Sequence, residues 1–139
     1  MKRAGGCLCG DVRIEVTGEP MTSGVCHCGQ CQKNCGGSAA TFMVFTAANV
    51  SLLKGELRYF DTVADSGNKI SRGFCPNCGT PIMSRLERTD KVIIVKLGAM
   101  DDPSFFTPEA VFWTSTAHDW ADFPDNTDQY FENPPPLGT

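Results

Sequence analysis

Eight cysteines are the residues of this sequence whose type and spacing point most directly to chemistry. Cys7 and Cys9 form a Cys-x-Cys pair, and Cys75 and Cys78 form a Cys-x-x-Cys pair. The other four lie in the stretch CHCGQCQKNC, residues 26–35. Clusters of this kind serve as metal ligands, disulfides or nucleophiles, and their spacing and surroundings separate these uses.

Glycine flanks the first two pairs, in GGCLCG and GFCPNCGT. It lets the backbone turn back so that its amides face the sulfurs and stabilise thiolate charge. Two such turns predict a closed structural zinc site, which would staple the N-terminal strand to the middle of the sheet. The alternatives are buried free cysteines or a redox pair, but a redox motif needs a strand-to-helix context and CPNC precedes the strand-like GTPIMSRL. The predicted ligands are Cys7, Cys9, Cys75 and Cys78.

A second group of sulfurs is predicted from the remaining cysteines. Cys26 and Cys28 project from one side of an extended segment and Cys31 returns across a short turn, so the three can converge on one ion. Three ligands leave a fourth position open, as in catalytic zinc sites. If Cys35 also binds, the site closes and is inert; if not, Cys35 is a neighbouring thiol. His27 is expected to point away from the shared side and to be a solvent-facing or core-satisfied ring rather than a ligand.

Length, charge and hydropathy limit the number of domains, the possible partners and the location of the protein. The 139 residues predict one zinc-binding domain, residues 1–132, followed by a proline-rich tail, residues 133–139. A net charge of −4 without a Lys/Arg block argues against nucleic acid as a partner. The absence of a long apolar run argues against a signal peptide and a membrane span, so a cytoplasmic location is expected. In that reducing compartment metal ligands or catalytic thiols are favoured over disulfides.

Short apolar and β-branched runs separated by turn residues must position these cysteines, and they predict an all-β fold. In DVRIEV the alternation places Val12, Ile14 and Val16 on one buried face. Only residues 29–36 predict a short helical turn, ending at Gly36. The expected strands are residues 12–16, 40–46, 49–53, 57–62, 69–74, 81–86, 92–98 and 109–115. Trp120, in TSTAHDW, is expected to pack over the sheet. His118 could carry a proton, but no other feature of the sequence supports that role.

Four segments together resemble the glutathione-dependent formaldehyde-activating enzyme family: GGCLCGDVRIEV, CHCGQCQKNCGGSAATFMVF, GFCPNCGTPI and VFWTSTAHDW. They occur in the family's order over residues 4–122. The resemblance implies an all-β fold of two stacked sheets with a zinc-stapled edge, similar to that of a small zinc protein that binds Rab GTPases. It also implies two zinc ions per chain. The first is structural, on Cys7, Cys9, Cys75 and Cys78; the second is catalytic, on Cys26, Cys28 and Cys31.

The implied activity joins formaldehyde to a small-molecule thiol, glutathione, to give S-hydroxymethylglutathione, or reverses that step. Such an enzyme is a carbon–sulfur lyase. Two departures near the expected substrate entrance leave the thiol open: Gln32 stands where the family often has arginine, and Cys35 where it usually has a small or polar residue. The carboxylates of glutathione would need a cation, and Lys33, Arg72 or Arg85 could supply it, although each is more simply a solvated surface charge.

A non-enzymatic zinc-binding scaffold, or protein-interaction module, is the alternative function. The resemblance extends to centromere protein V, a chromatin-associated vertebrate relative, and the expected fold is shared with a GTPase-binding protein. The acidic charge argues against DNA as the partner. A scaffold should hold both zinc ions inertly, whereas an enzyme should let a thiol reach one of them.

Overall fold

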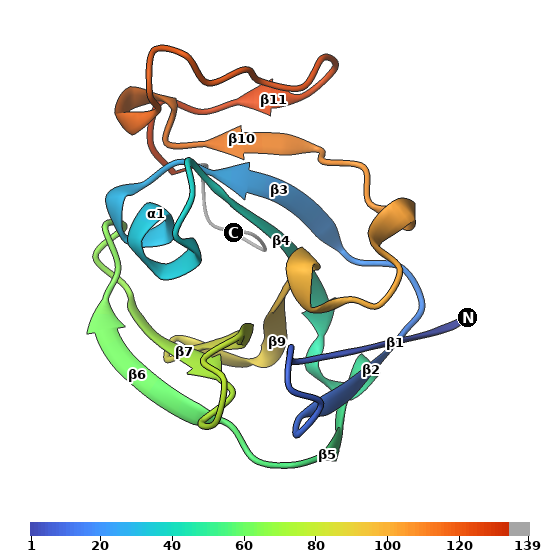
Figure 1. Ribbon diagram of the computed structural model, residues 1–139. Coiled ribbons are helices and arrows are strands. Elements are labelled where there is room, and N and C mark those ends of the chain that lie inside the picture. The colour runs from blue at the N-terminus through green and yellow to red at the C-terminus, as the bar shows by residue number, and fades with distance from the viewer. Residues whose placement is uncertain (134–139) are drawn as a thin grey trace.

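Two β-sheets make up most of the computed structural model, which describes residues 1–133 (Figure 1). The predicted all-β, two-sheet fold is therefore confirmed. The small sheet contains, in order, β1 (Lys2–Gly6), β2 (Arg13–Thr17) and β5 (Val50–Lys54). The large sheet contains, in order, β11 (Asp128–Gln129), β10 (Ala110–Phe112), β3 (Thr22–Cys26), β4 (Ala40–Thr46), β9 (Thr89–Lys96), β8 (Pro81–Leu86), β7 (Lys69–Phe74) and β6 (Arg58–Val63). Apart from Asn133, the expected proline-rich tail lies outside the described residues.

All strand pairs are antiparallel within the described residues, except that β10 runs parallel to both β3 and β11. The helices are short: α1 (Gly29–Cys35) and the 3₁₀ turns η1 (Ala47–Asn49), η2 (Leu97–Ala99), η3 (Pro103–Phe105) and η4 (Thr114–Thr116). The helical turn predicted over residues 29–36 is confirmed as α1, which ends at Gly36. Over residues 1–133, no helix has the length and apolar character needed to cross a membrane.

Each of the eight predicted runs corresponds to a strand, but β1, β3 and β11 were not predicted. Glycine interrupts β1 and β3, so they lack an alternating apolar pattern. Close packing explains the glycine at position 24 of β3, because a Cβ there would lie 2.9 Å from the Ala110 carbonyl oxygen of β10. The last predicted strand ends early, at Phe112, since Trp113 has the left-handed φ of 60°.

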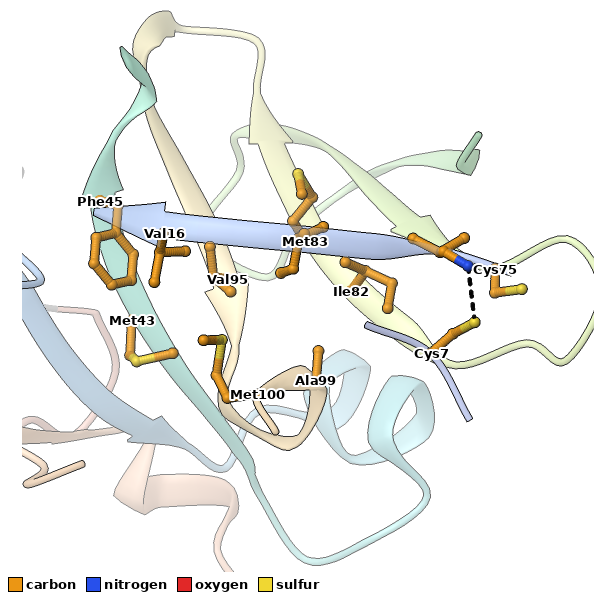
Figure 2. Close-up of a cluster of buried hydrophobic side chains, with 12 residues drawn as sticks. Cys7, Val16, Met43, Phe45, Cys75, Ile82, Met83, Val95, Ala99 and Met100 are labelled. Atoms are coloured by element: carbon orange, nitrogen blue, oxygen red, sulfur yellow. Dashed lines mark hydrogen bonds between the residues drawn. The ribbon is translucent and has the colours of Figure 1, made fainter. Parts of the chain in front are cut away.

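The main core lies between the two sheets (Figure 2). Val12, directly before β2, is 1% exposed, and Ile14 and Val16 of β2 are both 0% exposed, which confirms the predicted buried face. They pack with residues of the large sheet and of the segment that follows β9, including Met43, Phe45, Ile82, Met83, Val95, Ala99 and Met100. Burial of this apolar surface holds the small sheet against one face of the large one.

The opposite face of the large sheet carries a second, smaller cluster. On β4, Phe42 and Val44 alternate with the main-core residues, as side chains on successive strand positions must. They pack with Cys26 and Cys28, near the start of α1. The large sheet therefore separates two cysteine-containing clusters.

Candidate functional site

One group of sulfurs forms where the loop after β1 meets the β7–β8 loop. The Sγ atoms of Cys7, Cys9, Cys75 and Cys78 all lie within 4.8 Å of one another. The Cys7–Cys9 separation is 3.5 Å and the Cys9–Cys75 separation is 3.8 Å. Since all eight cysteines are free thiols, these four sulfurs are available to bind a metal ion.

Both cysteine pairs of this group lie in tight turns. The Val12 N–H donates to the Cys7 sulfur at 3.2 Å, the dashed line in Figure 2. Gly10 and Gly79, which follow the pairs, have φ of 84° and 80°, a left-handed conformation that side chains disfavour. The glycine-flanked turns predicted from the sequence thus direct backbone amides at sulfur.

Thr80 joins the two turns, and the sequence analysis missed it. Its hydroxyl accepts a hydrogen bond from the Leu8 N–H at 3.1 Å and lies 3.2 Å from the Cys78 sulfur. The side-chain and backbone hydrogen bonds of Thr80 lower the pKa of Cys78 to about 5, which favours the thiolate that metals bind. The available signal was a hydroxyl residue two positions after the Cys-x-x-Cys pair.

The position of this first group differs from the expected one. The turn that holds Cys75 and Cys78 connects β7 to β8, and only β6 separates β7 from the edge of the large sheet. The group therefore ties the small sheet to a region near that edge, and the expectation of a staple to the middle of the sheet was wrong. Figure 2 shows Cys7 and Cys75 at one end of the main core.

A second group forms at the start of α1, where the Sγ atoms of Cys26, Cys28 and Cys31 lie within 4.8 Å of one another. Cys26 ends β3, and Cys28 caps α1 by accepting a hydrogen bond from the Cys31 N–H at 3.4 Å. Hydrogen bonds from the Cys26 and Cys31 thiols lower the pKa of Cys28 to about 2. The hydrogen bond with Cys28 raises the pKa of Cys26. We call these three residues the triad; the lowered pKa favours the thiolate form of Cys28.

Cys35 and His27 lie outside the triad. The Cys35 thiol is exposed and donates to the Ala39 carbonyl at 3.2 Å. His27 is 2% exposed and its ring packs edge-on to Phe123, with 5.2 Å between centroids. Burial lowers the pKa of His27, and neither ring nitrogen has a hydrogen-bond partner among the described residues. His27 is thus a buried ring whose nitrogens are unsatisfied within residues 1–133, so the expectation of a solvent-facing or core-satisfied ring was wrong.

Gln32 has a structural contact at this site. Its side-chain amide donates to the His27 carbonyl at 2.8 Å and to the Thr116 carbonyl at 3.1 Å. The Thr116 hydroxyl donates to the same His27 carbonyl at 2.9 Å. The triad loop is therefore fixed to η4, the 3₁₀ turn after β10.

A cavity of about 530 Å³ opens at the triad, a volume suited to a small ligand. Cys28 and Cys31 line it, whereas none of the four cysteines of the first group does. Its apolar wall includes Ile94, Phe112 and Trp113. This cavity thus adjoins the triad, whereas the first group lies outside it and has Cys9 as its solvent-exposed member.

The candidate cations have different environments. Lys33 and Arg85 are exposed, as expected, and the Arg85 guanidinium lies 4.6 Å from the centre of the Tyr59 ring. Arg72 is only 8% exposed and lines the cavity, so the expectation of a solvated surface charge was wrong for it. Its burial depends on strand pairing that the sequence does not display.

The late His-Trp segment also differs from expectation. Trp120 is 72% exposed, so it does not pack over the sheet. Its ring stacks on His118, with centroids 5.1 Å apart and 10° between the planes. Neither residue lines the cavity at the triad.

Comparison with known proteins identifies the family. A model of the glutathione-dependent formaldehyde-activating enzyme family matches residues 2–116. No curated protein matches the chain. A crystal structure of a Rhodobacter sphaeroides protein, a structural genomics target, superposes with a TM-score of 0.56 at 21% identity, covering 73% of this chain and 88% of that one, which shows a shared fold. The chain belongs to the glutathione-dependent formaldehyde-activating enzyme family.

Proposed function

We propose that the protein is a zinc-dependent carbon–sulfur lyase that adds glutathione to formaldehyde, giving S-hydroxymethylglutathione, and catalyses the reverse step. In this addition the thiol sulfur forms a bond to the carbonyl carbon. The carbonyl π bond breaks, and its oxygen takes a proton equivalent to the one that the thiol loses. The family match supports this reaction class. We also place the protein in the cytoplasm, where eight free thiols stay reduced.

We assign the two sulfur groups to two zinc ions. Only sulfur ligands are present in each group, and thiolates favour zinc among the common divalent ions. A tetrahedral site with Zn–S bonds of about 2.3 Å places sulfurs about 3.8 Å apart. The measured separations of 3.5 and 3.8 Å in the first group fit that requirement. The structural ion would be held by Cys7, Cys9, Cys75 and Cys78, and the catalytic ion by Cys26, Cys28 and Cys31.

The observation that carries the proposal is the cavity beside the triad. Three protein ligands leave one position of a tetrahedral zinc open. Cys28 and Cys31 line the 530 Å³ cavity, so a small thiol has room to approach that position. The four cysteines of the first group border no part of this cavity, as suits a closed structural site.

Zinc in the triad would lower the pKa of a thiol that binds its open position, which produces a nucleophilic sulfur near neutral pH. The chain supplies the remaining conditions. Gln32 and Thr116 hold the triad loop through the His27 carbonyl, so the sulfurs keep their positions. Ile94, Phe112 and Trp113 supply an apolar wall against which a bound thiol would lie.

The test is NMR exchange between formaldehyde, glutathione and their adduct, because the reaction also proceeds without enzyme and only an accelerated exchange rate is informative. Wild-type protein should accelerate the exchange, and Cys28→Ala should not, although it keeps the fold and the first metal ion. Wild-type protein with two zinc ions that leaves the rate unchanged would contradict the proposal. That result would favour the alternative, a zinc-binding scaffold, or a different thiol.

A further inference from the structure

Arg72 is a buried cation on the same face of the large sheet as the triad. In register, it lies opposite Ser84 of β8, which lies opposite Ile94 of β9, a residue of the triad's apolar cluster. Arg72 is 8% exposed. An arginine side chain keeps its charge in proteins, and burying a charge is costly unless an opposite charge and hydrogen bonds compensate for it.

The protein provides only part of that compensation. The Arg72 Nη1 donates to the Gln30 side-chain oxygen at 2.9 Å, and the Gln30 amide nitrogen donates to the Val63 carbonyl at 2.7 Å. The buried Arg72 Nε has no hydrogen-bond partner among the described residues, and neither has the buried Ser84 hydroxyl. Gln30 therefore fixes the guanidinium while leaving hydrogen-bonding capacity unused.

Within residues 1–133, no carboxylate forms an ion pair with this guanidinium. The ion pairs of the described residues do not include Arg72, so no carboxylate oxygen in that part of the chain lies within 4.0 Å of its nitrogens. Asp65, Glu109 and Asp128 line the same cavity, but outside that distance. A charged group that is buried, oriented and unpaired at a cavity wall suits an anionic ligand.

We propose that Arg72 binds a carboxylate of the thiol substrate while the substrate sulfur is at the triad. The planar guanidinium matches a carboxylate in geometry as well as in charge. Cys28, Cys31 and Arg72 line one cavity, so a single molecule that carries both a thiol and a carboxylate can contact both ends. Arg72 is then a residue that determines substrate specificity, and Gln30 is its positioning residue. This inference rests on the proposed function.

Binding can be measured apart from chemistry with S-methylglutathione, whose sulfur carries no proton, and with its diethyl ester, which lacks the carboxylates. Isothermal titration calorimetry on the zinc-loaded protein should give at least tenfold tighter binding of the acid than of the ester. Arg72→Met should abolish that preference and leave ester binding and the content of two zinc ions unchanged. Arg85→Met is the matched control, because it removes an exposed arginine one strand away, and it should behave as wild type.

Gln30→Glu provides a second variant with a more conservative change. Its carboxylate would pair with the Arg72 Nη1, so it should also reduce the preference for the acid. The inference is overturned if wild-type protein binds acid and ester equally, or if the preference survives in Arg72→Met. It is also overturned if Arg72→Met loses the triad zinc, since Arg72 would then serve the metal site.

The exchange experiment separates this inference from the proposed function. Wild-type protein that prefers the acid through Arg72 but does not accelerate formaldehyde exchange would contradict the enzyme assignment and leave the carboxylate site supported. Accelerated exchange without a preference for the acid would support the enzyme assignment and overturn the carboxylate site.

Discussion

At the scale of single residues, Cys28 combines two roles in one sulfur atom. Hydrogen bonds from the thiols of Cys26 and Cys31 lower its pKa, which favours the thiolate form that binds a metal ion. It also caps α1 by accepting a hydrogen bond from the Cys31 N–H. The residue that would bind the catalytic metal ion thus also starts the helix that carries Cys31.

Replacing Cys28 should separate these roles. Cys28→Ala and Cys28→Ser should each hold one zinc ion per chain in place of two. Serine is a good N-cap and alanine is not, so the alanine variant should be less stable than the serine variant by about 1 kcal/mol. Elemental analysis and urea unfolding measure the two effects. Two zinc ions retained in Cys28→Ala would exclude Cys28 as a ligand.

Replacing Cys35, unlike replacing Cys28, should not remove a zinc ion. Its sulfur lies outside the triad and donates to backbone carbonyls, among them that of Ala39. Cys35→Ser should keep both zinc ions and the exchange activity. If this variant loses the second ion, Cys35 closes a four-cysteine site, and the open position required for catalysis does not exist.

At the scale of elements, the first group of sulfurs connects the small sheet to the β7–β8 turn. Structural zinc binding contributes to folding free energy on the order of 10 kcal/mol, comparable with the whole net stability of a domain. Cys75→Ser should therefore lower the melting temperature drastically or prevent folding. Cys31→Ser, which removes a triad ligand outside the main core, is the control and should lower the melting temperature far less. Unchanged melting of Cys75→Ser would contradict a structural role for the site.

Thr80 allows a milder test of the same connection. Thr80→Val keeps the shape of the side chain but removes the hydroxyl shared by Leu8 and Cys78. Loss of such a contact to a ligand should weaken zinc binding at this site by about 10–100-fold. Competition with a chromogenic chelator measures the affinity, and Thr80→Ser should retain it. Equal affinities for the valine variant and wild type would show that Thr80 does not tune the ligand.

Sequence reasoning predicted what depends on nearby residues and missed what depends on distant pairing. The cysteine groups were predicted because members of each pair are close in sequence, and α1 because Gly36 ends it. The burial of Arg72 was missed because it depends on strand register and on Gln30, 42 positions away. Likewise, β1 pairs with β2 although its own residues, KRAGG, have little strand preference.

At the scale of the whole molecule, the large sheet separates the two cysteine groups. One face packs against the small sheet and forms the main core, with the first group of sulfurs at its end. The other face carries the triad, its cavity and Arg72. Because the two clusters share no residues, a change at the triad can alter ligand binding without disturbing the main core.

The central claim is that a thiol reaches one metal site and not the other, and cobalt(II) substitution tests it most directly. Cobalt in thiolate sites gives charge-transfer absorption that grows with the number of bound thiolates. With both sites loaded in wild type, glutathione should increase this absorption by the equivalent of one thiolate per chain. In Cys28→Ala, which should hold cobalt in the first site alone, glutathione should leave the absorption unchanged. A wild-type spectrum that glutathione leaves unchanged, with both cobalt ions still bound, would contradict the account.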